Sequence, residues 1–276
     1  MQITFHGVRG STPCHGDATS KYGGNTSCVS VAAPGQPPIL CDLGTGARYF
    51  GLSWPNDRVF DGTVLVTHLH WDHLQGLPFF PPILQPASHL QFVAPVPSTG
   101  RSLPDEVRTA IQPPLFPVGI DELPGNISFR EVADCEFMVG DVRVMSRLVP
   151  HIGATVGYRL EYGGHSVAYI SDHQQPGVDV YEAGEGARAL ADGVDVLIHD
   201  AQYTRAEFEH KRDWGHCTFE YACWMAEQSG VGQLVLFHHD PLHDDAMIDR
   251  LHGEISAATD IDVIAAHEGL VLHLGR

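Results

Sequence analysis

Short apolar runs alternate with glycine-rich turns over the first part of the chain. The residues at 3–5 predict a strand, and the runs at 28–31 and 39–42 predict a hairpin pair. A further apolar run at 64–66 predicts a strand that is buried on both faces. The N-terminal region is therefore expected to contribute mainly strands.

From residue 127 the alternation of apolar and polar positions returns, and helical patterns interrupt it. Further strands are predicted near 127–130, 142–148, 155–161, 166–170, 194–198, 233–237, 261–265 and 269–273. Helices are predicted at 183–192, 204–211, 217–229 and 243–258. Strands mixed with late helices favour two sheets packed face to face with helices outside, in a single domain spanning 1–276.

Four potential metal ligands follow the run at 64–66 within six residues: His68, His70, Asp72 and His73. Side chains alternate along a strand, so His68 and His70 point the same way, and a turn brings the other two to the same place. Imidazole and carboxylate together are ligands of zinc, iron or manganese rather than calcium. The alternative is a polar loop that is rich in histidine by chance.

Three more potential ligands each follow a later predicted strand: His151, Asp172 and His238. Together with the cluster at 68–73, their order resembles the signature of the metallo-β-lactamase superfamily, and the resemblance extends from Gly7 to the final strand. It implies an αββα sandwich and a site for two adjacent divalent metal ions. Zinc is the first candidate for these ions, and manganese and iron are the alternatives.

The resemblance also implies how the ligands divide between the two ions. One ion would be held by His68, His70 and His151, and the other by Asp72, His73 and His238. Asp172 would bridge the two ions. His239 competes with its neighbour for the last ligand position, and only the strand register favours His238.

An aspartate ahead of the cluster belongs to the same pattern. The segment Asp42-Leu43-Gly44-Thr45-Gly46 resembles the early Asp-x-Gly turn of the superfamily. The resemblance implies that Asp42 orients the ligand loop by hydrogen bonds to a ligand histidine. The alternative is an aspartate that only caps a turn.

Two later segments are similar to motifs of ribonuclease Z and its phosphodiesterase relatives. Trp214-Gly215-His216-Cys217-Thr218 resembles a His-Ser-Thr segment, and His199-Asp200-Ala201-Gln202 resembles a His-Glu-Ala-Thr segment with aspartate in place of glutamate. The resemblance implies that His216 is a general acid assisted by Asp200, although the shorter carboxylate leaves their pairing open. The alternative for His216 is a helix-capping or packing histidine.

Residues 78–126 carry many prolines around a predicted short helix at 104–111. The segment is too long for a plain connector and too apolar for a disordered linker. We interpret it as an insertion that is either a lid over the metal site or a surface elaboration packed on its own prolines. Its exposed face is also a candidate homodimer interface.

Composition narrows the class of function. The 16 Lys and Arg against 34 Asp and Glu give a net charge of −18, which disfavours binding a long nucleic acid and favours a small-molecule substrate. Neither a signal peptide nor an apolar run of ~18 residues is visible, so we expect a soluble, cytoplasmic protein without a membrane partner. The six cysteines form no Cys-x-x-Cys pair and are expected to be free thiols.

These features favour a dinuclear metal-dependent hydrolase, most of all a phosphodiesterase acting on a small diester such as a cyclic nucleotide. A metal-bridging hydroxide would attack, with Asp72, His216 and Asp200 as the catalytic candidates. One alternative is an acyl hydrolase, namely a lactonase, a thioesterase or a β-lactamase-like enzyme. Another is a ribonuclease Z-like tRNA 3′ endonuclease, which ranks lower because only 152–171 fill the interval where ribonuclease Z carries its tRNA-gripping arm. A flavodiiron-type redox role is also disfavoured. Such members of the superfamily typically have glutamate in place of the second cluster histidine, here His70, and carry an appended flavodoxin domain, which does not fit the length of this chain.

Overall fold

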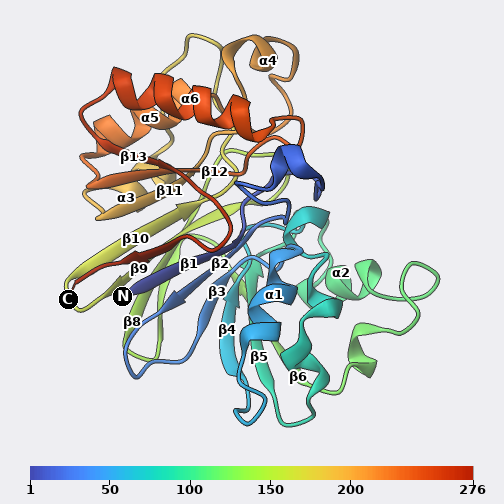
Figure 1. The fold of residues 1–276 in the computed structure, drawn as a ribbon. Helices are drawn as coiled ribbons and strands as arrows, with labels where there is room; N and C mark the ends of the chain where they lie inside the picture. The colour runs from blue at the N-terminus through green and yellow to red at the C-terminus, as the bar shows by residue number, and fades with distance from the viewer. Residues whose placement is uncertain (276) are drawn as a thin grey trace.

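Two mixed sheets of seven strands lie face to face in the computed structural model, which describes residues 1–275 (Figure 1). The first sheet has the order β14-β1-β2-β3-β4-β5-β6. Its strands from β1 to β3 form an antiparallel meander, and those from β3 to β6 are parallel. The bounds are β1 (Gln2–Gly7), β2 (Cys28–Ala32), β3 (Ile39–Cys41), β4 (Asp61–Leu65), β5 (His89–Pro95), β6 (Asn126–Val132) and β14 (Val271–His273).

The second sheet has the order β13-β12-β11-β10-β9-β8-β7 and repeats this arrangement. Strands β7 to β10 form an antiparallel meander, and β10 to β13 are parallel. The bounds are β7 (Cys135–Val139), β8 (Val142–Leu148), β9 (Val156–Tyr162), β10 (His165–Ile170), β11 (Val196–Asp200), β12 (Gln233–Phe237) and β13 (Asp262–Ala265).

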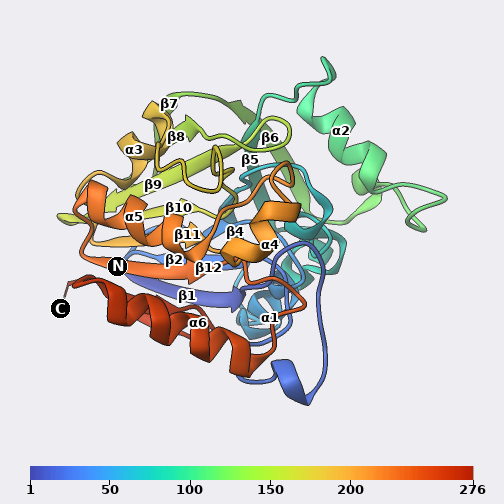
Figure 2. The same cartoon turned by 90° about the horizontal axis from the view of Figure 1, so that it is seen from above.

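Helices cover the outer face of each sheet, so the predicted αββα sandwich is confirmed (Figures 1 and 2). The first sheet carries α1 (Gly46–Ser53) and α2 (Leu103–Ala110), and α2 lies at the edge of the molecule in Figure 2. The second sheet carries the later helices, α3 (Glu185–Ala191), α5 (Phe219–Ser229) and α6 (Asp245–Ala258), with the short α4 (Arg205–His210) near the strand ends.

The layer between the sheets is apolar and dominated by valine, leucine and aromatic side chains. The ring of Phe237 on β12 lies 6.1 Å from that of Phe5 on β1, which joins the two sheets across the core. The buried hydroxyl of Tyr158 on β9 donates a hydrogen bond of 2.8 Å to the carbonyl of Val66, just after β4. These contacts fix how the strand ends of one sheet face those of the other.

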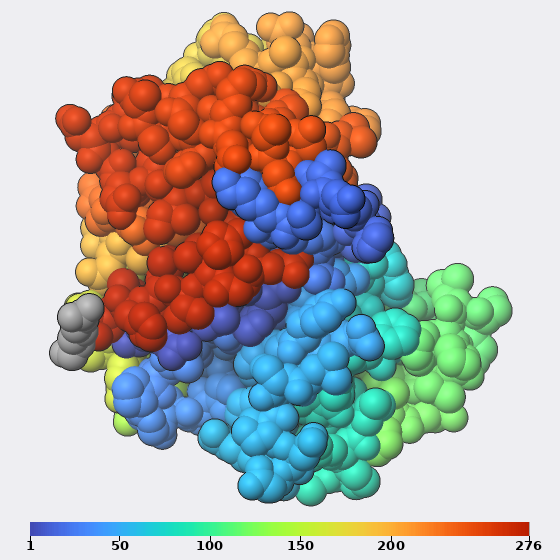
Figure 3. Space-filling view, in the orientation of Figure 1, coloured from blue at the N-terminus to red at the C-terminus, as the bar shows by residue number. Residues whose placement is uncertain are grey.

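The N-terminal loop closes over one side of this sandwich. After the 3-10 turn η1 (Asp17–Thr19), the backbone N–H of Lys21 donates to Asp245 at 2.8 Å, and the hydroxyl of Tyr22 donates to Asp249 at 2.6 Å. In Figure 3 this blue segment lies against the orange and red C-terminal part of the chain, where α6 begins. The loop that precedes the turn is thereby held beside the strand ends.

The structure corrects part of the interpretation of residues 78–126. This segment contains β5, which lies inside the first sheet and pairs in parallel with both β4 and β6. Phe80, which lies in this segment, is buried between Phe50 and Phe60 and cannot belong to a lid, and its neighbour Phe79 is exposed. The lid interpretation therefore concerns only the part that follows β5. The pattern also missed α1 and the edge strand β7.

Among the described residues, no helix combines the length and the apolar character that a membrane span requires.

The intersheet core allows a direct test of the packing. Leu160 on β9 is fully buried between the sheets, whereas Leu115 is 78% exposed. We expect Leu160→Ala to lower the free energy of unfolding by about 2–5 kcal/mol because it leaves a cavity. Leu115→Ala is the matched control, and chemical denaturation should find a change of no more than about 0.5 kcal/mol. Equal effects of the two substitutions would contradict the assigned core.

Candidate metal centre

All seven residues predicted as metal ligands gather at one edge of the sandwich. They follow the carboxyl ends of β4, β8, β10 and β12, which point toward the same side of the molecule. The 3-10 turn η2 (Trp71–His73) brings Asp72 and His73 back beside His68. Ligand sites at the carboxyl ends of parallel strands are the rule for open sheets.

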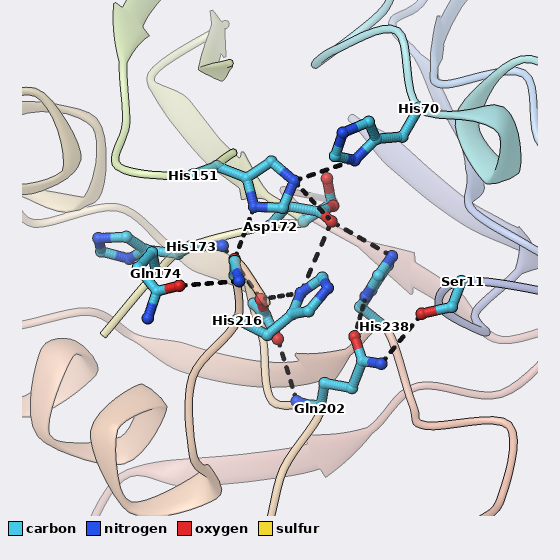
Figure 4. A network of polar contacts seen from close by, with 12 residues as sticks. Ser11, His70, His151, Asp172, His173, Gln174, Gln202, His216 and His238 are labelled. Carbon is cyan, nitrogen blue, oxygen red and sulfur yellow. Dashed lines mark hydrogen bonds and ion pairs between the residues drawn. The ribbon is translucent and has the colours of Figure 1, made fainter. Parts of the chain in front are cut away.

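The first half of the cluster consists of His68, His70 and His151. Their ligating nitrogen atoms lie within 4.8 Å of one another, and His151 Nε2 is 3.2 Å from His70 Nδ1. Asp172 Oδ2 lies 3.8 Å from the Nε2 atoms of both His68 and His151. Figure 4 shows His70, His151 and Asp172 turned toward one another.

The second half consists of Asp72, His73 and His238. Asp72 Oδ2 lies 3.3 Å from His73 Nε2 and 3.2 Å from His238 Nε2. Asp172 again reaches across, because its Oδ1 is 3.2 Å from His73 Nε2 and its Oδ2 is 3.5 Å from His238 Nε2. Asp172 thus lies between the two halves, at the position that the sequence predicts for the bridge.

The buried polar atoms of this cluster fit divalent cations. The Nε2 atoms of His68 and His73 and Oδ1 of Asp172 are buried and have no hydrogen-bond partner. Leaving such atoms unpaired is costly, and a cation among them would satisfy all three. Histidine with carboxylate is also the donor set that zinc accepts.

The carboxylates and imidazoles of the cluster shift one another's pKa values. Burial opposes ionisation of Asp72 and Asp172, but the surrounding histidines outweigh burial and hold the pKa of both carboxyls below the usual range. Burial lowers the pKa of His68 and brings that of His151 to about 4. Burial opposes the charged forms of His73 and His238 as well, but the neighbouring carboxylates outweigh it and raise the pKa of both imidazoles. A cation bound at this cluster would take the place of their protons.

Asp42 holds the loop of ligands in place, which confirms its predicted role. Its carboxylate accepts hydrogen bonds of 2.8 Å from His73 Nδ1, from the backbone N–H of Thr67 and from the hydroxyl of Tyr169. Because Nδ1 of His73 carries the proton, its Nε2 is left as the lone pair that faces the cluster.

Two glycines allow the chain to approach the ligand rings. A Cβ at Gly215, whose φ is +95°, would lie 2.3 Å from the ring of His151. The carbonyl of Gly215 accepts a 2.6 Å hydrogen bond from His151 Nδ1, which leaves Nε2 facing the cluster. A Cβ at Gly10 would similarly lie 2.4 Å from His238 Nδ1. Neither position accommodates a side chain without moving a ligand.

The choice between the two adjacent histidines after β12 is clear in the structure. His238, with φ of +60°, turns into the cluster, and its Nδ1 lies 2.9 Å from Oε1 of Gln202. His239 turns the other way, where its Nε2 donates to the carbonyl of Ala266 at 2.9 Å and its ring packs on Tyr22.

His216 and Asp200 form a hydrogen-bonded pair beside the cluster, so the aspartate side chain reaches the histidine although it is shorter than glutamate. His216 Nδ1 lies 2.9 Å from Asp200 Oδ2 and 3.7 Å from Asp172 Oδ2. Asp200 is fully buried, and the backbone N–H groups of His173 and Gln202 also donate to it at 3.0 Å. The position of this carboxylate is therefore fixed from three sides.

The cluster opens into a cleft of about 550 Å³. His216 lines it together with Asp72 and Asp172, and two tryptophans form part of its wall, Trp71 with 54% and Trp214 with 61% exposure. A substrate that enters the cleft therefore meets both the metal cluster and the imidazole of His216.

Several residues that support the site carry no signal in the sequence pattern. Gln202 bridges His238 to the hydroxyl of Ser11, whose backbone N–H donates to Asp72 at 2.7 Å. His199 Nδ1 donates to the carbonyl of Asp200 at 2.7 Å, so its Nε2 accepts a 2.9 Å hydrogen bond from His173 Nδ1. His199 and Gln202 belong to the segment that resembles His-Glu-Ala-Thr, but the resemblance gave a role only to Asp200, and Ser11 and His173 lie outside both motif segments.

The fold and this site define a hydrolase of the metal-binding αββα class. The family model of the β-lactamase superfamily domain matches residues 52–239. The chain belongs to the metallo-β-lactamase superfamily.

Curated relatives of the chain include ribonuclease Z enzymes. Ribonuclease Z of Haloarcula marismortui is 25% identical, over 98% of this chain and 96% of the relative. Ribonuclease Z of an Exiguobacterium species is 28% identical, over 72% of this chain and 78% of the relative.

Solved structures of several enzymes share the fold over nearly the whole chain. Zinc-bound PqqB from Methylobacterium extorquens aligns with a TM-score of 0.73 and 18% identity, covering 99% of this chain and 100% of PqqB. The short form of human tRNase Z gives 0.71 and 20%, covering 100% of both chains. A diphosphatase of the PhnP family gives 0.70 and 17%, covering 99% of this chain and 98% of the diphosphatase.

The role of Asp42 is testable by an isosteric change. Asp42→Asn removes the charge that faces Nδ1 of His73, and we expect metal affinity to fall about 10- to 100-fold, as for other partners of metal ligands. Competition with a chromophoric chelator measures the affinity, and circular dichroism monitors the fold. Asp61→Asn, at the exposed start of β4, is the control. An unchanged affinity in Asp42→Asn would show that the ligand loop does not depend on this carboxylate.

Proposed function

We propose that the protein is a dinuclear metal-dependent phosphodiesterase that acts on a small phosphate diester, such as a cyclic nucleotide. The observation that carries this proposal is the pair of His216 and Asp200, 2.9 Å apart, which adjoins the metal cluster and lines the same cleft. Cleavage of a phosphate ester needs both a charged site for the phosphate oxygens and a proton for the leaving alkoxide.

The metal cluster is proposed to hold the phosphate. His68, His70 and His151 would hold one ion, Asp72, His73 and His238 would hold the other, and Asp172 lies between these two groups of residues. Zinc fits the imidazole and carboxylate donors best, PqqB is zinc-bound in its structure, and manganese and iron remain the alternatives. When bound, such ions lower the pKa of water and stabilise the charge on the phosphate oxygens.

His216 is proposed to donate the proton to the leaving group. Its Nδ1 is bonded to the carboxylate of Asp200, so Nδ1 keeps its proton and Nε2 is the atom that exchanges one with the substrate. Asp200 also stabilises the imidazolium that must form before each transfer. General acid catalysis of this kind contributes on the order of 10²- to 10⁴-fold to the rate.

The small size of the proposed substrate rests on shape and charge. Between His151 and Asp172 the chain forms only the β9–β10 hairpin, joined by Gly163 and Gly164, which leaves no length for an extended tRNA-gripping arm. The net charge of −18 further disfavours a long polyanion. Cleavage of tRNA 3′ ends, as in the ribonuclease Z relatives, is therefore the second candidate.

Acyl hydrolysis is the remaining alternative, because the same ions polarise a carbonyl group. The pair of His216 and Asp200 is the feature that favours phosphate ester cleavage over lactone, thioester or β-lactam cleavage, since these reactions have less need of a separate acid.

The central test is hydrolysis of bis(p-nitrophenyl) phosphate by protein loaded with zinc or manganese. We expect cleavage by the unmodified protein and a drop in kcat of about 10²- to 10⁴-fold in His216→Ala, with the metal content unchanged. His89→Ala, at a partly exposed position on β5, is the matched control and should keep full activity. No cleavage by protein shown to hold both ions would refute the proposal and direct the search to lactones, thioesters and β-lactams.

The bridging role of Asp172 has its own test. We expect Asp172→Asn to bind about one equivalent of metal where the unmodified protein binds about two, because a neutral amide is a weaker ligand for both ions at once. Metal analysis after gel filtration measures the ratio, and the loss of diester cleavage should accompany it. Two equivalents in Asp172→Asn would contradict the bridge, whatever the activity.

A further inference from the structure

A second, smaller cavity of about 170 Å³ adjoins the cleft that holds His216. His70 and Ile152 line both spaces, so the two meet along these side chains beside the metal cluster. The small cavity extends from His68 toward the end of β5 and the start of α2. No step in the proposed reaction so far uses it.

The wall of the small cavity is mostly apolar. Its side chains come from three separate segments, with Leu69 from the ligand loop, Pro95 and Pro97 from the end of β5, and Ile152 and Ala154 from the loop after His151. An apolar cavity of roughly 150 Å³ is enough to hold benzene. The space therefore has the size and character for one six-membered ring.

The charges around this cavity do not favour an anionic group. Neither lysine nor arginine is among its lining residues, and its one carboxylate is that of Glu106 on α2. The hydroxyl of Thr99 donates to Glu106, and Arg101 lies 3.9 Å from it. A phosphate placed at the far end of this cavity, away from His68 and His70, would lie beside the carboxylate of Glu106, and no lysine or arginine of the lining could pair with it.

We propose that this small cavity binds an uncharged, apolar ring on the non-leaving arm of an open-chain phosphate diester. The proposal rests on the proposed phosphodiesterase function: His216 protonates the leaving oxygen in the cleft, so the other ester arm points to the opposite side of His70. The two ester arms of a cyclic phosphate belong to one ring and cannot enter both spaces. Within the proposed class of small diesters, the small cavity therefore favours an open-chain diester with one apolar substituent, and a cyclic nucleotide would leave this cavity unused.

The segment that follows β5 acquires a role in this arrangement. Pro97, Ser98, Thr99 and Glu106 all come from the part of residues 78–126 that lies outside the sheet. This segment then sets which diester fits, as a fixed wall of the small cavity beside the metal cluster.

The experiment compares benzyl p-nitrophenyl phosphate with methyl p-nitrophenyl phosphate, which share the leaving group. We expect kcat/KM to favour the benzyl ester by about tenfold or more, because burying a ring removes much more apolar surface from water than burying a methyl group. Ala154→Leu and Ser98→Leu fill the cavity from two different segments of its lining, and each should bring the ratio to about one. Ala257→Leu, on the exposed face of α6, is the matched control and should keep the preference.

A binding measurement separates this proposal from the proposed function. Titration calorimetry of the metal-loaded protein should find benzylphosphonate bound about tenfold tighter than methylphosphonate, with the difference lost in both cavity-filling variants. If the phosphonates behave in this way but neither diester is cleaved, the cavity assignment stands and the phosphodiesterase function fails. Equal binding of the two phosphonates by the unmodified protein, or a preference that survives both folded variants, overturns the cavity assignment.

Discussion

The site depends on the hydrogen bonds that the buried carboxylate of Asp42 accepts. It follows β3 of the first sheet, holds His73 through Nδ1, and accepts the hydroxyl of Tyr169 on β10 of the second sheet. A single side chain therefore fixes a ligand loop of one sheet to a strand of the other. Asp172 lies three residues beyond Tyr169, so the same contact sets where the bridging carboxylate enters the cluster.

Asp42 itself adopts a positive φ of 62°, as does His238 with 60°. Non-glycine residues avoid this conformation unless the surrounding contacts enforce it, and such residues concentrate at functional sites. Here both lie directly after a strand and turn a polar side chain from the sheet direction into the space between the sheets. The stability of the apolar layer below, with Phe5, Phe237 and Leu160, sustains these conformations.

The fold class and the candidate ligands could be predicted because the cluster at 68–73 and the polar residues after later apolar runs resemble the signature of the superfamily. Apolar runs mark the parallel strands, and a polar residue at the end of such a run must lie at the sheet edge. The pairing of His216 with Asp200 was not predictable, because it depends on the backbone of His173 and Gln202, which hold the shorter carboxylate in reach.

The elements that the pattern missed have particular causes. Strand β5 lies among prolines that suggested an insertion, and its pairing with β4 and β6 is non-local. Helix α1 contains Gly46 and Gly51, which lower helix propensity, yet a Cβ at Gly51 would lie 2.4 Å from Pro81. The packing of α1 against the proline-rich turn thus requires Gly51, the same residue that weakens the helical signal in the sequence. Edge strand β7 is largely exposed on one face and lacks a continuous apolar run.

The distance between the proposed acid and the metal cluster is set by one short loop. The carbonyl of Gly215 accepts a hydrogen bond from His151, its N–H donates one to Oε1 of Gln174, and the next residue is His216. The loop is further held by Lys211, which lies 3.0 Å from Asp240 and over the ring of Tyr203. The ring of the candidate ligand His151 is therefore hydrogen-bonded to the residue directly before the proposed proton donor His216. In the proposed reaction, this loop would set the distance between the leaving oxygen of a substrate held by the cluster and the imidazole of His216.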